Sequence, residues 1–111
     1  MPEPECILVL TTWPADADAA AFATRLVDER LAACVAVHAP MESIYRWQGT
    51  IERAAERQLV IKTSAARREA LLTRLAELHP YDVPEVLVLK VDGGGAVYLK
   101  WVEGATERGE N

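Results

Sequence analysis

The alternation of hydrophobic and polar positions predicts four strands. Residues 6–12 are apolar on both alternating faces, which is typical of a strand that is covered on two sides. A second strand over 33–37 is interrupted near Pro40 and resumes over 43–47, because proline within a run indicates a bulge or a sheet edge. The chain then turns at Gln48 and Gly49, so we expect a long hairpin whose tip lies outside the core. The remaining strands are predicted over 50–62 and 85–91.

Hydrophobic residues spaced at three and four positions predict two helices between these strands. The first is capped by Asp16 or Asp18, and its apolar positions are Ala19, Phe22, Ala23, Leu26, Val27 and Leu31. Ser64 is predicted to cap the second helix, which ends at His79 and Pro80. Its apolar stripe contains Leu71, Leu72, Leu75 and Leu78. A short C-terminal helix or turn is expected over 96–102, and the last nine residues are expected to be frayed.

The order of elements is therefore β-α-β-β-α-β, the ferredoxin-like split βαβ arrangement of the α+β class. It predicts a four-stranded antiparallel sheet with both helices on one face. The first strand is apolar on both sides, so the helix-free face would expose a larger hydrophobic patch than monomers usually tolerate. We therefore predict a homo-oligomer that packs sheet against sheet.

Length, charge and cysteine content narrow the class of protein. The 111 residues predict one domain over 1–111, with its core at about 5–103. A net charge of −5 without a Lys/Arg cluster predicts no nucleic-acid partner. The acidic first residues and the short apolar run that follows predict neither export nor membrane insertion, and hence a cytoplasmic protein. The two cysteines, Cys6 and Cys34, are expected to be unpaired in a reducing compartment.

Several short segments together resemble the CutA divalent-cation tolerance family, and they cover essentially residues 6–102. They are Thr11-Thr12 with Pro14, Leu31-Ala32-Ala33-Cys34-Val35, Ser43-Ile44-Tyr45 with Trp47 and Gly49, Lys62-Thr63, His79-Pro80-Tyr81 with Pro84-Glu85, and Tyr98-Leu99 with Trp101. The resemblance implies a ferredoxin-like homotrimer whose long hairpins wrap a neighbouring subunit. It also implies tolerance to divalent metals, copper binding, no settled reaction and no obligatory cofactor. Thr11 stands where some members have Cys, so a soft ligand is missing there.

Three residues are candidate metal ligands. The imidazole of His79 could bind copper or zinc, or it could cap the carbonyls at the end of the second helix. Glu85 could supply a carboxylate to the same ion, could pair with Lys62, or could be a solvated charge. Cys34 lies in an apolar strand, where its thiol is either buried and inert or a further ligand. Structural zinc takes about four ligands, so we expect metal binding to be weak, shared between chains, or both.

Four aromatic residues are candidates for the walls of a ligand cleft. Tyr45 and Trp47 lie on the same side of their strand, and Tyr81 and Trp101 could join them around a pocket. The alternative is that these side chains anchor a subunit interface, where Tyr and Trp are enriched. Both roles are compatible with a cleft between subunits, in which Lys62 would supply a cation and Glu85 an anion.

These residues are compatible with functions of three classes. The first is a non-catalytic trimer that binds divalent metal or a small anion in the intersubunit cleft and takes part in copper tolerance. The second is a ligand-sensing or partner-binding module that resembles the PII signal proteins and uses the projecting hairpin. The third is an enzyme such as an acylphosphatase-like hydrolase, for which the sequence contains no Ser/His/Asp arrangement and no anion-binding glycine loop with arginine. We therefore predict that the protein is not an enzyme.

Overall fold

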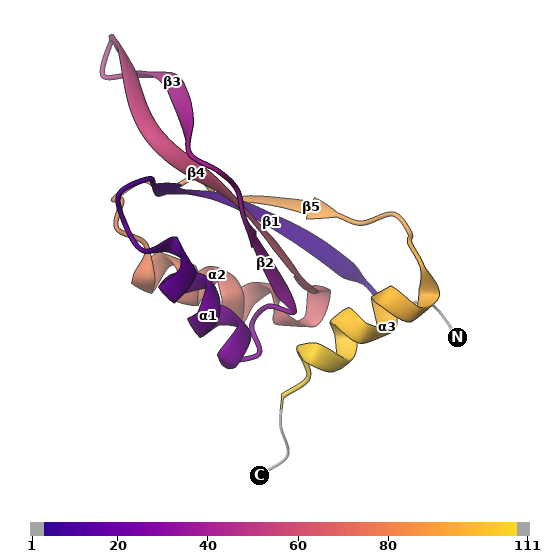
Figure 1. Cartoon of the computed structure of the whole chain (residues 1–111). Helices are drawn as coiled ribbons and strands as arrows, with labels where there is room; N and C mark the ends of the chain where they lie inside the picture. The colour runs from indigo at the N-terminus through magenta and orange to yellow at the C-terminus, as the bar shows by residue number, and fades with distance from the viewer. Residues whose placement is uncertain (1–3, 109–111) are drawn as a thin grey trace.

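The computed structural model describes residues 4–108, which form one antiparallel sheet with helices packed against it (Figure 1). The strands are β1 (Cys6–Pro14), β2 (Cys34–Val37), β3 (Met41–Trp47), β4 (Thr50–Ser64) and β5 (Leu87–Lys90). The helices are α1 (Ala19–Asp28), α2 (Arg68–Leu78) and α3 (Ala96–Ala105), and a 3-10 turn (Ala65–Arg67) precedes α2. This arrangement confirms the predicted ferredoxin-like α+β fold.

The sheet has the order β2-β4-β1-β5, and β3 pairs with the part of β4 that extends beyond β2. The predicted second strand is thus two strands, β2 and β3, that share β4 as their partner. Gln48 and Gly49 have positive φ angles of 50° and 81°, as a two-residue hairpin turn requires, and Trp47 pairs with Thr50 across the turn. The hairpin of β3 and β4 projects from the body of the molecule (Figure 1), whose extents are 50 × 31 × 23 Å.

The core lies between one face of the sheet and helices α1 and α2, which lie side by side beneath it (Figure 1). Alternate residues of β1 and β4 point into this layer, where Val9, Leu59 and Ile61 are fully buried. Leu26 of α1 and Leu75 of α2 are fully buried against them. The carboxylate of Asp18 accepts a hydrogen bond of 3.0 Å from the Ala21 amide, which identifies Asp18 as the N-cap of α1.

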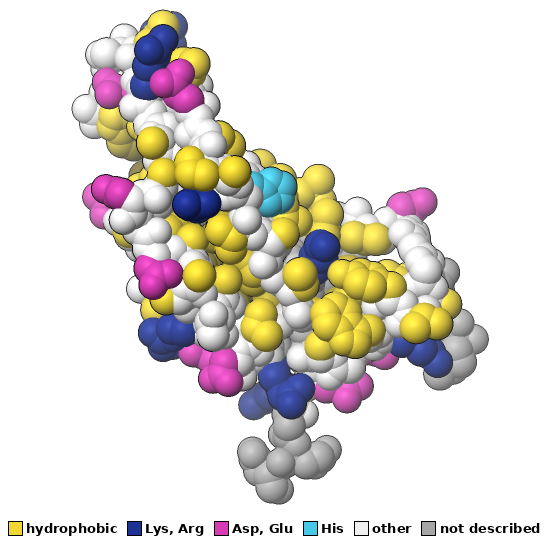
Figure 2. All heavy atoms as spheres, viewed as in Figure 1, with side chains coloured by type: hydrophobic (Ala, Val, Ile, Leu, Met, Phe, Trp, Pro, Cys, Tyr) yellow, Lys and Arg dark blue, Asp and Glu magenta, His cyan; other side chains and the backbone are white. Residues whose placement is uncertain are grey.

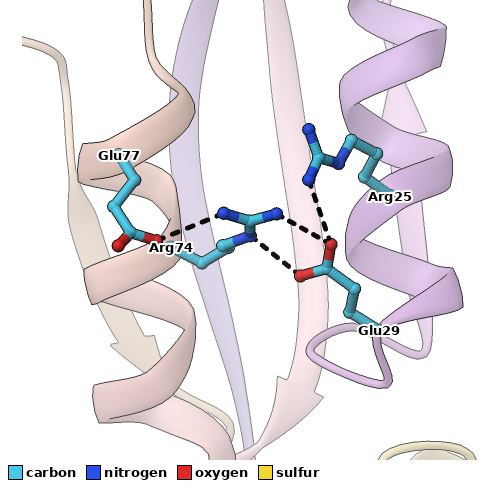
Figure 3. Close-up of polar contacts among 4 residues, drawn as sticks. All are labelled: Arg25, Glu29, Arg74 and Glu77. Atoms are coloured by element: carbon cyan, nitrogen blue, oxygen red, sulfur yellow. Dashed lines mark hydrogen bonds and ion pairs between the residues drawn. The ribbon is translucent and has the colours of Figure 1, made fainter.

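Charged side chains join α1 and α2 on their outer surface (Figure 3). The guanidinium of Arg74 donates to both carboxylate oxygens of Glu29, at 2.9 and 3.0 Å. Glu29 also accepts a bond of 3.5 Å from Arg25, and Arg74 donates one of 3.3 Å to Glu77. The hydrogen bonds from Arg74 lower the pKa of Glu29 below its ordinary value. Because solvent reaches these groups, we expect the network to contribute little to the stability of the fold.

Two predictions about helix ends were wrong. Ser64 does not cap α2, because the 3-10 turn intervenes and the Ser64 hydroxyl lies 2.9 Å from the hydroxyl of Thr106 instead. The last helix continues to Ala105, and the Thr106 side chain is buried and donates to the Val102 carbonyl at 2.9 Å. Packing of α3 on the sheet therefore orders this segment beyond residue 102. The fraying expected at 109–111 lies outside the described residues.

The face of the sheet opposite α1 and α2, which we call the open face, is only partly covered. Helix α3 packs on its far end, where Leu99 and Val102 form a small cluster with Cys6 and Ala33. Figure 2 shows hydrophobic side chains gathered over α3 on the visible side of the molecule. The rest of the open face carries Leu8, Leu10, Ala36, Val60, Leu87 and Leu89, of which Leu87 and Leu89 are 54% and 43% exposed. The exposed apolar face is as predicted, and its cover by sister copies remains a prediction.

Candidate functional site

A hollow of about 830 Å³ lies between the base of the hairpin and the loop that follows α2. Strand β3 contributes Tyr45 and Trp47, whose side chains point to the same side because they are two positions apart. Strand β4 contributes Glu56 and Gln58, and the loop contributes several residues that include Tyr81 and Glu85. The antiparallel register of β3 and β4 brings these side chains to one surface, at the hairpin end of the open face.

Hydrogen bonds fasten the loop to β4 across this hollow. The phenol of Tyr81 donates a bond of 2.7 Å to Oε2 of Glu56, a residue that is only 7% exposed. The amide of Gln58 donates to Oε2 of Glu85 at 2.8 Å and to the Thr11 carbonyl at 2.9 Å. Burial, with the hydrogen bond to Glu56, raises the pKa of Tyr81 well above its ordinary value. The phenol is therefore a stable donor at neutral pH.

His79 is buried beside the hollow with both ring nitrogens in use. Its Nδ1 accepts a bond of 3.1 Å from the Tyr81 amide, so Nε2 carries the proton and donates to the Thr12 carbonyl at 2.7 Å. Burial lowers the pKa of His79, and its ring packs edge-on against Trp13 with centroids 4.7 Å apart. The imidazole therefore holds a strand carbonyl rather than the helix carbonyls expected of a cap, and it would have to give up one bond to bind a metal.

Cys34 lies on strand β2, far from the point where the His79 ring contacts the sheet. It pairs in register with Lys62, which pairs with Leu8 of β1, whereas His79 contacts β1 four positions further on, at Thr12. Four strand positions correspond to about 13 Å. Cys34 is partly buried, not fully buried as its apolar neighbours suggested, and both cysteines are free thiols. Within residues 4–108 no three His, Cys, Asp or Glu side chains are grouped closely enough to hold a metal ion.

The structure thus brings together only part of the predicted cleft. Tyr45, Trp47, Tyr81 and Glu85 line the hollow. Lys62 lies further along the sheet beside Cys34, and Trp101 lies on α3, where its ring is 5.5 Å from that of Tyr98. Lys62 and Trp101 therefore do not meet the other cleft residues within one chain.

The sequence reasoning missed Glu56 and Gln58. Both lie in the strand predicted over 50–62, and neither was named as a candidate site residue. Residues two positions apart on a strand point to the same face. Glu56, Gln58 and the apolar Val60 are spaced in this way, so the sequence could have placed all three side chains on the open face. Glu56 is buried and Gln58 is partly buried, and both are bonded to the loop after α2. Strand periodicity does not report contacts with a loop.

The fold and the hollow define a small ferredoxin-like α+β protein with an acidic, aromatic hollow and an uncovered sheet face. None of the helices described between residues 4 and 108 has both the length and the apolar content to cross a membrane.

Comparison with known proteins identifies the family. A family model described as CutA1 divalent ion tolerance protein matches residues 7–105. The divalent-cation tolerance protein CutA of Pectobacterium atrosepticum is 44% identical over 98 residues, which cover 88% of this chain and 89% of that protein. The chain therefore belongs to the CutA1 divalent ion tolerance family, which confirms the resemblance found in the sequence. The family description names divalent ions and no reaction.

Solved structures agree with this assignment. The crystal structure of CutA from Xylella fastidiosa is 43% identical and has a TM-score of 0.87, over 92% of this chain and 98% of that chain. The PII-like protein CutA from Nostoc sp. PCC 7120, solved in apo form, is 37% identical with a TM-score of 0.85, over 91% of this chain and 97% of that chain. The match covers more than nine-tenths of this chain in both cases, so the fold as a whole is that of these CutA structures.

Proposed function

We propose that this protein is a cytoplasmic, non-catalytic homotrimer that takes part in the cell's response to divalent cations, copper among them. The observation that carries the proposal is the hollow beside an uncovered apolar sheet face, in a chain of the divalent ion tolerance family. A hollow in such a place is a ligand site that a neighbouring copy would border. Within the described residues it contains no nucleophile held by a base, which supports a binding role rather than a catalytic one.

The open face supports the oligomer. Leu87 and Leu89 present apolar surface to water on the open face. On the opposite face of the hairpin, Ile44 and Ile51 are 61% and 65% exposed. Covering these side chains would bury hydrophobic area, which is the main driving force of association. The proposal assigns Lys62, Trp101 and its neighbour Tyr98 to the contact between copies, because they lie on the same side of the sheet outside the hollow.

Metal binding in this proposal is weak and uses few groups from each chain. The donors that face the hollow are the carboxylates of Glu56, Asp82 and Glu85. Carboxylates suit hard divalent cations, whereas copper favours imidazole and thiolate. Copper binding would therefore call on His79, at the loss of one of its two hydrogen bonds, or on Cys34 near the contact between copies.

Titration calorimetry with copper and zinc chloride on tag-free protein tests this function. Substitutions Glu85→Gln, His79→Ala and Cys34→Ser remove the proposed ligands one at a time. Glu52→Gln is the matched control, because Glu52 lies on the same strand as Glu56 and outside the lining of the hollow. We expect weaker binding in at least one ligand variant and unchanged binding in the control. Equal binding in all four variants would exclude these ligands.

A second function is favoured by the hairpin and by one relative. The Nostoc protein is described as PII-like, and the hairpin of this chain projects as a signalling loop would (Figure 1). Figure 2 shows Lys/Arg and Asp/Glu side chains close together at its end. A pull-down from cell extract that loses a partner when residues 46–52 are replaced would support a partner-binding module. Identical captures with and without this replacement would count against it.

A further inference from the structure

We propose that the hollow binds an organic ammonium ion, such as a quaternary or primary amine, held between aromatic rings and carboxylates. The inference rests on the proposed function in one respect, because it takes the hollow as the ligand site. It goes further by naming the chemical class of the ligand. Two features of the lining support this inference: its negative charge and its aromatic side chains.

The charge of the hollow is negative and uncompensated. Its lining includes Glu56, Asp82 and Glu85 and, within residues 4–108, no Lys, Arg or His side chain. Glu56 is 7% exposed, yet its hydrogen-bond donor is the neutral phenol of Tyr81. Glu85 likewise accepts from the neutral amide of Gln58. A buried carboxylate is normally paired with a cation, so Glu56, together with the partly buried Glu85, favours a positively charged ligand and disfavours an anion.

The walls of the hollow are aromatic. Tyr45 and Trp47 come from the hairpin, line the hollow, and are 45% and 48% exposed in the single chain. Tyr81 completes the set from the opposite side, where its hydroxyl is held by Glu56. Ring faces attract ammonium groups by cation–π interaction, and indole is the strongest of the common rings. Aromatic walls combined with carboxylates therefore match an alkylated or amino ligand rather than a bare ion.

The dimensions also favour an organic cation over a metal ion. A volume of about 830 Å³ lies within the range of small-molecule pockets. A divalent ion needs several oxygen ligands converging within about 2.0 to 2.6 Å of one point. The described residues contain no group of three acidic, histidine or cysteine side chains with that convergence. An ammonium ion needs no such convergence, because its charge is spread over several bonds and its contacts are longer.

Titration of the oligomer with choline chloride tests the inference. The chain contains three tryptophans, Trp13, Trp47 and Trp101, so three indole N–H signals report on three separate places in proton–nitrogen correlation spectra. We expect choline to shift the Trp47 signal selectively and sodium chloride of equal ionic strength to leave it in place. Sodium acetate should have no larger effect than sodium chloride. Tetramethylammonium chloride should reproduce the shift, since it carries the same charged group.

Variants separate recognition from folding. Glu56→Gln keeps an acceptor for Tyr81 and removes the charge, and we expect it to weaken choline binding about tenfold. Trp47→Leu should weaken it by a similar factor. Glu85→Gln serves the same purpose if Glu56→Gln does not fold, and Glu52→Gln is the control that should bind as the parent does. Unchanged affinity in Glu56→Gln and Glu85→Gln, or shifts equal to those caused by sodium chloride, would overturn the inference.

The same titrations distinguish this inference from the proposed function. Choline binding in the hollow without any copper or zinc binding would support the inference and count against the metal response. Metal binding without choline binding would overturn the inference and leave the metal response in place.

Discussion

Tyr81 donates a hydrogen bond of 2.7 Å to Glu56, a residue 25 positions earlier in the chain. This bond joins the loop after α2 to the base of the hairpin on β4. It places the Tyr81 ring and the carboxylate of the buried Glu56 together in the lining of the hollow. The relationship therefore determines the shape of the candidate site, and it can be tested separately from any ligand.

Removal of the Tyr81 hydroxyl should destabilise the protein. Tyr81→Phe leaves the carboxylate of Glu56, a residue that is 7% exposed, without this donor. An unsatisfied buried group costs about 1 to 3 kcal/mol, so we expect the free energy of unfolding to fall by that amount. Urea denaturation followed by circular dichroism measures it. Tyr98→Phe, at a residue 46% exposed on α3, is the control and should change little.

Acidification should destabilise the protein through His79. Burial is the largest effect on this ring and lowers its pKa from the ordinary value of 6.5, although the Thr12 carbonyl and Glu56 act in the opposite direction. The unfolded chain therefore binds the proton first, and stability is present above about pH 6.5 and lost as the pH falls toward the lower folded pKa. Comparison of urea midpoints at about pH 7.5 and about pH 5.5 measures the loss. The loss of stability between these two pH values should be smaller in His79→Gln. An equal loss in that variant would show that other groups cause the pH dependence.

The ion pair between the helices should make a small, salt-sensitive contribution. Arg74→Ala removes both hydrogen bonds to Glu29 (Figure 3). We expect a slight drop in the urea midpoint that becomes smaller at high salt, because solvent-accessible charges are screened. The difference should also narrow at acidic pH, since Glu29 has a lowered pKa and its stabilising effect is lost as the pH falls through that value. A salt-independent loss would instead indicate that the Arg74 side chain acts by packing.

A charge on the open face should break the oligomer without unfolding the chain. Leu87 is 54% exposed on the edge strand β5, so Leu87→Glu is tolerated by the single chain and is costly in an apolar contact. Light scattering should show a shift toward the chain mass of 12.2 kDa. Ala76→Glu, on the exposed outer side of α2, should keep the parent mass. A parent protein that already has the chain mass at micromolar concentration would contradict the trimer.

A buried hydroxyl on β4 should be replaceable with a gain in stability. Thr63 is fully buried, and its hydroxyl has no hydrogen-bond partner within residues 4–108. Thr63→Val exchanges the hydroxyl for a methyl group of similar volume, and we expect the free energy of unfolding to rise by about 1 kcal/mol. Thr106→Val is the matched control and should destabilise, because that hydroxyl bonds the Val102 carbonyl and contacts Ser64. A loss of stability in both variants would indicate a hidden partner for Thr63.

The periodicity of the chain was sufficient to predict most of the fold. Strand alternation and helix spacing report which face of each element is apolar, and only a small number of layered arrangements can bury those faces. The break at Pro40 and the turn at Gln48 and Gly49 were likewise local, because backbone geometry there depends on the residues themselves. The exposed face that predicts an oligomer follows from the same alternation.

What the tertiary structure decided was which distant residues meet. The sequence predicted that Tyr45, Trp47, Tyr81 and Glu85 belong to the site, and these residues line the hollow. It could not show that Glu56 and Gln58 line the hollow with them. Nor could it show that Lys62 and Trp101 lie elsewhere. It also could not show that both nitrogens of His79 are bonded to the backbone, or that Ser64 contacts Thr106. Local pattern fixes the direction in which a side chain points, whereas its neighbours depend on strand register and on how loops fold over the sheet.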